Sequence, residues 1–179
     1  MSAEPSTRRP SSGLLRSALV GGVIAGGFLA WYLFAYGTRI LAIPFHPHAP
    51  DLALIAAAPL AIRIHIAAAL TAFAIGTALL IGVKGTTVHR TLGWTWVGAM
   101  GTTAGSSFFI HQINPDGFSF VHLISGWVVI VLPMAVYAAR RHDVASHRRH
   151  MVGLFVGGLV VAGLLTFLPG RMMWRVFFG

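Results

Sequence analysis

The sequence predicts an all-α membrane protein with five transmembrane helices. Of its 179 residues, 56% are hydrophobic and only 9% are charged, and the mean hydropathy of +0.77 is far above that of an ordinary soluble domain. The four acidic residues all lie outside the apolar runs: Glu4, Asp51, Asp116 and Asp143. Several of these runs have the length of about 20 residues that crosses the hydrocarbon core of a bilayer.

The N-terminal part of the chain predicts a tail, an anchor and a loop. Residues 1–13 are rich in Pro and Ser and predict a mobile cytoplasmic tail. Residues 14–42 contain the uncharged run Ser17–Tyr36, which is too long for a secretory signal peptide and has no convincing cleavage site, so it predicts a retained transmembrane anchor. Residues 43–60 carry four prolines and predict a periplasmic loop at or in the membrane interface.

Residues 61–170 predict a four-helix bundle core, followed by a periplasmic C-terminal tail over residues 171–179. Short polar connections between the apolar runs make each helix antiparallel to the one before it. The four expected spans are residues 61–83, 88–111, 118–139 and 146–168.

Positive charge predicts the orientation. Nine basic residues fall on one side of the predicted spans, namely Arg8, Arg9, Arg16, Lys84, Arg90, Arg140, Arg141, Arg148 and Arg149. Four fall on the other side, namely Arg39, Arg63, Arg171 and Arg175. The richer side is cytoplasmic, so the N-terminus lies inside and the C-terminus outside a bacterial inner membrane. Because these charges lie at the ends of the apolar runs, we expect them to set the topology and to contact anionic lipid, and we do not expect nucleic-acid binding.

The histidines reveal an internal repeat. His65 is followed 24 positions later by His89 and Arg90, and His122 is followed 25 positions later by His147 and Arg148. Two hairpins repeated in the same orientation predict a pseudo-two-fold axis along the membrane normal. His65 would then face His122 near the outer surface, and His89 would face His147 near the inner surface, the two levels being about 22 Å apart.

Four histidines at two levels predict two haem groups. Ionisable side chains inside membrane spans are costly and normally have a partner, and two opposed neutral imidazoles suit the axial positions of a haem iron. The absence of cysteine excludes covalent haem attachment and thiolate-bound clusters, which leaves haem b. His150 competes with His147 as the inner ligand, but His147 keeps the repeat.

Other residues would serve the same cofactors. Gly93 and Gly126 follow His89 and His122 by one helical turn on the same face, which gives room for a flat macrocycle. Arg90 and Arg148 would neutralise the haem propionates at the inner surface.

Four motifs resemble a bacterial family of multi-span membrane proteins whose function is unassigned. They begin at His89 (HRTLGW), Phe118 (FSFVHLIS), His147 (HRRHM) and Phe167 (FLPGR), and the resemblance covers about residues 61–174. It implies membership without implying an activity. The helical core is also similar in architecture to transmembrane cytochromes b, which bind two haems and move electrons from ascorbate or quinol.

We therefore expect a di-haem b-type electron-transfer protein, an oxidoreductase linked to a quinol or another small donor. One alternative is a non-haem metal protein, with zinc or copper bound by His65, His111 and His122. Another is a structural accessory subunit of a larger membrane complex, docked through the anchor helix of residues 14–42.

Overall fold

The computed structural model describes residues 45–110 and 120–179, together with residues 27, 30 and 34, which are helical. The remaining parts of the predicted tail and anchor lie outside the described residues, as do His111 and Asp116. The chain divides into two units, Met1–Ala42 and Ile43–Gly179, and the following account concerns the second unit.

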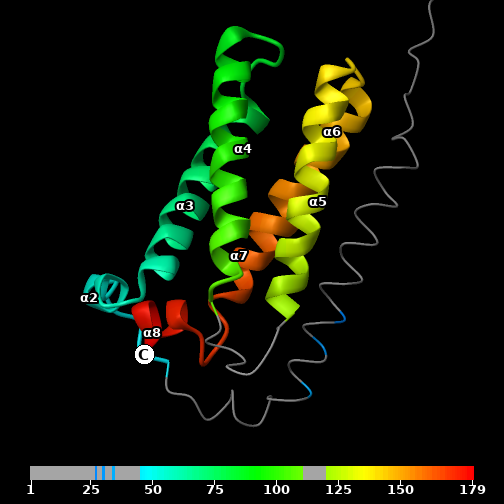
Figure 1. Ribbon diagram of the computed structural model, residues 1–179. Coiled ribbons are helices and arrows are strands. Elements are labelled where there is room, and N and C mark those ends of the chain that lie inside the picture. Colours follow the sequence, from blue (N-terminus) through cyan, green and yellow to red (C-terminus); the bar gives the residue numbers. More distant parts are fainter. Residues whose placement is uncertain (1–26, 28–29, 31–33, 35–44, 111–119) are drawn as a thin grey trace, which may run out of the picture. The chain divides into compact units, whose positions relative to one another are not determined.

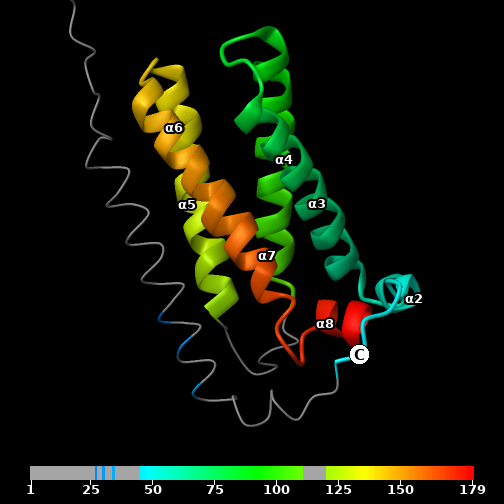
Figure 2. The same ribbon diagram turned by 180° about the vertical axis from the view of Figure 1, so that it is seen from behind.

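Every regular element in residues 45–110 and 120–179 is a helix. The elements are α2 (Leu52–Ala56), α3 (Leu60–Ile81), α4 (Thr87–Ser107), α5 (Phe120–Arg140), α6 (Val144–Gly153), η1 (Leu154–Val161), α7 (Ala162–Leu165) and α8 (Met172–Phe178). Figure 1 shows that α3, α4, α5 and the run from α6 to α7 lie beside one another, with the α3–α4 and α5–α6 turns at the same end. The reverse view in Figure 2 shows the same arrangement.

Three helices are long and apolar enough to cross a membrane. They are Leu60–Ile81, His122–Arg140 and Val144–Leu165, with mean hydropathies of 2.1, 1.8 and 1.4. These apolar helices are compatible with a multi-pass protein in contact with lipid. The predicted span of residues 88–111 is helical as α4. It is not among these three helices, because Thr, Ser, His and Arg lower its hydropathy.

The turns between the long helices follow from local sequence. At the end of α3, the Lys84 ammonium group donates to the carbonyls of Leu80 and Gly82 at 2.6 and 2.7 Å, which satisfies carbonyls that the helix leaves open. Gly85 has φ of 80°, a conformation that favours glycine. The Thr86 hydroxyl then accepts from the backbone N–H of His89 at 3.1 Å and starts α4.

Asp143 starts α6 in the same way. Its Oδ1 accepts from the Ser146 N–H at 2.9 Å, after the short turn that follows Arg140. Both hairpins therefore turn within a few residues, as the sequence predicts.

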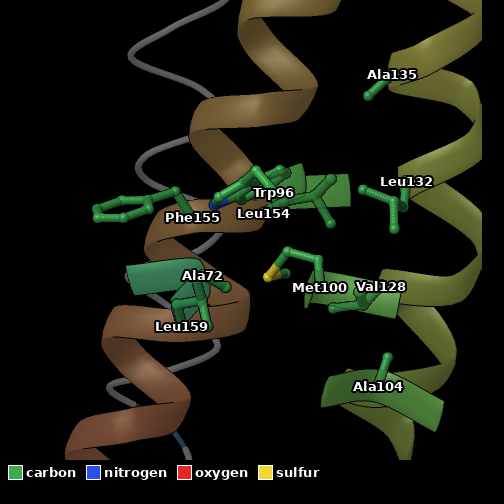
Figure 3. Close-up of a cluster of buried hydrophobic side chains, with 10 residues drawn as sticks. All are labelled: Ala72, Trp96, Met100, Ala104, Val128, Leu132, Ala135, Leu154, Phe155 and Leu159. Carbon is green, nitrogen blue, oxygen red and sulfur yellow. The ribbon is translucent and has the colours of Figure 1, made fainter. Parts of the chain in front are cut away.

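A single apolar core joins the long helices (Figure 3). Helix α3 packs against α4 and η1, α4 packs against α5, and α5 packs against α6 and η1. Trp96 and Met100 of α4 are 2% and 1% exposed and contribute the largest side chains from the centre of the core. The remaining buried members are Ala72, Ala104, Val128, Leu132, Ala135, Leu154, Phe155 and Leu159.

Two glycines allow the helices to approach closely. A methyl carbon placed on Gly76 of α3 would lie 2.5 Å from Phe155 Cδ2 and 2.7 Å from Trp96 Nε1. One placed on Gly158 of η1 would lie 3.1 Å from a methyl group of Val128. Small residues at such contacts let helices pack through their backbones, which is the main way that helices associate in lipid.

The helical run that begins at α6 changes its winding in the middle. Residues Leu154–Val161 form a π-helix of eight residues, and ordinary α-helix resumes at Ala162. Leu154, Phe155 and Leu159 are buried there, so the wider winding lies at the core. The sequence predicted one uninterrupted helix over residues 146–168.

Two short helices replace segments that the sequence predicted as a loop and a tail. The N–H groups of His46, His48 and Asp51 donate to the carbonyls of Phe178, Phe177 and Val176 at 3.1, 3.1 and 2.9 Å. The open carbonyls at the end of α8 therefore receive donors from the segment that precedes α2. Phe45 also stacks on Phe178, with ring centroids 4.9 Å apart.

Candidate functional site

His65 of α3 reaches the end of α4. Its Nδ1 lies 2.9 Å from the Thr103 carbonyl oxygen and 3.2 Å from the Ser106 hydroxyl oxygen. A carbonyl oxygen can only accept, so this bond requires the imidazole proton on Nδ1. In the neutral form of the ring the lone pair is then on Nε2, where a histidine can bind a metal.

His122 of α5 approaches the same end of α4 from another helix. It is 6% exposed, and its ring centroid lies 6.2 Å from that of Phe108, the residue that ends α4. One turn along α5 from His122, the Ser125 hydroxyl accepts a short hydrogen bond from the Ser107 hydroxyl. The last turn of α4 thus lies in contact with both histidines of the predicted outer level.

His147 of α6 repeats the arrangement of His65 at the other end. Its Nδ1 lies 3.0 Å from the carbonyl oxygen of Ala135 on α5. The proton is again required on Nδ1, so the neutral form of this ring has its lone pair on Nε2. Ala135 is fully buried, so this bond lies in the packed interface between α5 and α6.

His89 lies in the first turn of α4, outside the three helices that have the hydropathy of a membrane span. Its backbone N–H donates to the Thr86 hydroxyl at 3.1 Å.

The same hydrogen-bond arrangement therefore occurs at both predicted levels. His65 and His147 each donate from Nδ1 to a backbone carbonyl of the neighbouring helix in its hairpin. Histidines that bind metals commonly use one nitrogen in this way, which fixes the tautomer and the orientation of the ring.

The predicted glycines have free space beside them. A methyl carbon added to Gly93 or Gly126 would meet no atom within 4 Å beyond its own helix. Arg90 and Arg148, the predicted propionate partners, are both exposed at the end of the unit that carries the two helix turns.

His150 has different surroundings from His147. It lines a hollow of about 500 Å³ beside the α5–α6 turn, and its Nδ1 lies 3.5 Å from the Ser146 hydroxyl. Met134 and Tyr137, which also line this hollow, are 49% and 60% exposed. His147 has the buried backbone partner that a fixed ligand needs, and His150 faces an open surface.

Sequence reasoning missed the partners of the histidines. The carbonyls of Thr103 and Ala135 belong to the backbone and carry no side-chain signal. The Arg140 guanidinium lies 5.8 Å from the centre of the Trp94 ring and connects the last residue of α5 to the N-terminal half of α4, although its charge alone suggested only a topological role.

The described residues, 45–110 and 120–179, contain no group of side chains that would form the alternative zinc or copper site. No group of three or more His, Asp or Glu in these ranges could hold a metal ion. His111, a ligand of the predicted zinc or copper alternative, lies outside them.

No family model, curated protein or solved structure matches the chain. The function is therefore inferred from the chemistry of its own residues.

Proposed function

We propose that the protein is a di-haem b-type electron-transfer protein that spans the bacterial inner membrane. The observation that carries this proposal is the pair of bonds from His65 and His147 to backbone carbonyls of neighbouring helices. When the ring is neutral, each bond leaves the Nε2 lone pair available, in a helix whose composition suits a membrane interior.

The proposal includes five transmembrane helices, with α4 as a span despite its polar residues. Its 21 residues are about 31 Å long, which matches the hydrocarbon core. Hydroxyls along it donate to carbonyls of the same helix, as in the bonds of Thr95 to Thr91 and of Thr103 to Ala99 at 3.2 and 2.8 Å. Such internal bonds reduce the cost of polar groups in lipid.

The helix contacts support a four-helix bundle with a pseudo-two-fold axis. Since α3 packs against α4 and η1, while α5 packs against α4 and the run that begins at α6, the helices make a closed ring of neighbours. In such a ring α3 is diagonal to α5, and α4 is diagonal to α6. His65 and His122 then belong to one diagonal pair of helices, and His89 and His147 belong to the other.

The proposed haem groups would use residues of this chain at two separate levels. His65 and His122 would hold one group, and His89 and His147 would hold the other, with Gly93 and Gly126 leaving space for them. The packed residues Trp96 and Met100 lie between the two levels along α4, which is why we propose two groups instead of one.

Each bound haem would supply a one-electron ferric–ferrous couple. The chain would orient it by the fixed imidazoles and would neutralise its propionates at the inner surface with Arg90 and Arg148. The donor is proposed to be a quinol or another small reductant at one membrane surface.

The proposed orientation has the N-terminus in the cytoplasm and the C-terminus in the periplasm. Lys84, Arg90, Arg140, Arg141, Arg148 and Arg149 belong to the end of the unit that carries the two helix turns, whereas Arg63, Arg171 and Arg175 belong to the other end. This excess of basic residues supports a cytoplasmic location for the turns.

A reduced-minus-oxidised optical spectrum of the purified full chain tests the proposal. The cells would be supplied with a haem precursor, and the wild type would be compared with His65→Ala and His147→Ala. His142→Asn is the matched control, because His142 is exposed in the α5–α6 turn and Asn tolerates its φ of 56°.

We expect b-type Soret and alpha bands in the wild type and in the control, and about half the haem in each of the two alanine variants. A wild-type protein without these bands, even after haem supplementation, would reject the function. Equal haem in the alanine variants and the control would reject the assigned ligands.

A further inference from the structure

The hollow beside the α5–α6 turn joins apolar and charged residues in one site. Its volume is about 500 Å³, and it is lined by Pro133, Met134, Tyr137, Ala138, Arg141, Asp143, Ser146 and His150. It lies on one hairpin and does not include any of the four histidines proposed to bind haem. The proposed function therefore does not use it.

The two charged residues of this hollow lie at one end of it. Pro133 and Met134 lie about two helical turns from the end of α5, whereas Arg141 and Asp143 lie in the turn itself. From Pro133 to Arg141 the chain rises about 12 Å at 1.5 Å per residue. A phospholipid in the adjacent leaflet has the same order, with its charged headgroup at the membrane surface and its acyl chains deeper.

The charged residues of the hollow form a pair of opposite sign. The Arg141 guanidinium donates to the Tyr137 hydroxyl at 3.1 Å and lies 5.7 Å from the centre of the Tyr137 ring, so it is held at the edge of the hollow. The Asp143 carboxylate accepts from the Ser146 N–H through Oδ1. A carboxylate has about four lone-pair sites, so it can accept further donors.

We propose that this hollow binds one phosphatidylethanolamine molecule. The phosphate is recognised by Arg141, and the primary ammonium group donates to Asp143. One acyl chain lies along Pro133 and Met134.

The carboxylate determines which lipid class is favoured. The quaternary ammonium group of phosphatidylcholine has no N–H to donate to Asp143. Phosphatidylglycerol has no cation, and its net negative charge meets that carboxylate. A site with Arg141 alone would favour anionic lipid, as basic membrane surfaces generally do.

Native mass spectrometry of the detergent-purified full chain tests this proposal, with phosphatidylethanolamine, phosphatidylcholine and phosphatidylglycerol supplied in equal amounts with the same acyl chains. We expect one phosphatidylethanolamine to be retained with about a three- to fivefold preference over the other two lipids. This preference corresponds to the free energy of one solvent-accessible ion pair. Arg141→Gln should lower the retention of this lipid, while Arg175→Gln, which removes the same charge at the other end of the unit, should not.

Asp143→Asn is the decisive variant. Asparagine caps a helix as well as aspartate does, so α6 keeps its start while the negative charge is lost. The preference over phosphatidylcholine should then disappear. Equal retention of all three lipids by the wild type, a preference for phosphatidylglycerol, or an unchanged preference in Asp143→Asn would each overturn the proposal.

Discussion

Substitution of Gly76 by alanine should destabilise the contact between three helices. Gly76 lies on α3, and the added methyl group would lie 2.5 and 2.7 Å from two ring carbons of Phe155 on η1 and 2.7 Å from the indole nitrogen of Trp96 on α4. Ordinary carbon contacts are about 3.5 Å or longer, so Phe155 must move by about 1 Å. Phe155 is also stacked on Phe73, with ring centroids 5.7 Å apart, which opposes this movement.

The expected change in the free energy of unfolding follows from two opposing effects. Overpacking a core costs about 1–3 kcal/mol, while replacement of glycine by alanine inside a helix contributes up to about 1 kcal/mol of stability. Gly98→Ala is the matched control, because Gly98 is inside α4 and a methyl group there would meet no atom within 4 Å beyond its own helix. Both variants gain the same helix propensity, so the difference between them measures the overpacking.

Thermal unfolding in detergent, followed by circular dichroism, provides the assay. Gly76→Ala should unfold at least about 2 °C below Gly98→Ala, from the usual relation of free energy to the midpoint for a chain of this size. Phe155→Leu should recover part of the loss in the Gly76→Ala background, because leucine vacates the space of the ring. Equal midpoints for the two alanine variants would refute the close approach of α3 to α4 and η1.

Two further predictions concern polar contacts and are read in the same assay. Ser107→Ala should lower the free energy of unfolding by about 1 kcal/mol, because the buried hydrogen bond between the Ser107 and Ser125 hydroxyls is lost, and the double alanine variant should cost less than the sum of the single ones. Thr86→Ala and Asp143→Ala should each cost about 1 kcal/mol through loss of a helix cap, whereas Thr86→Ser and Asp143→Asn should cost little. Alanine variants as stable as these conservative ones would contradict the capping roles.

The long helices were predictable because hydropathy and short polar turns determine them. The expected spans 61–83 and 88–111 correspond to Leu60–Ile81 and Thr87–Ser107, and the main difference is the earlier end of α4. The α2 and α8 helices were missed, since each is too short to show a periodic pattern. They are stabilised by bonds between segments far apart in the sequence, as between Asp51 and Val176.

The π-helix was missed for a related reason. Its wider winding depends on what surrounds Gly157 and Gly158, which lie against Trp127, Val128 and Met100 from other helices. A local sequence pattern does not contain that information.

For the candidate site, the sequence indicates which histidines to consider but not their partners. The spacing of the histidines predicts two levels, and the pairing of histidines across the bundle stays a prediction. The bonds from His65 and His147 to Thr103 and Ala135 were not predictable, because every residue has a backbone carbonyl. Only the packing of neighbouring helices determines which carbonyl each imidazole meets.

The haem content of the full chain tests the central claim most directly. The protein would be produced with a haem precursor, and its haem would be measured as the pyridine complex against the amount of polypeptide. The two pairs of histidines predict about two haem b groups per chain, with axial ligands supplied at both levels. A preparation that is folded, as judged by its helical circular dichroism, and that contains no haem after supplementation would contradict the account.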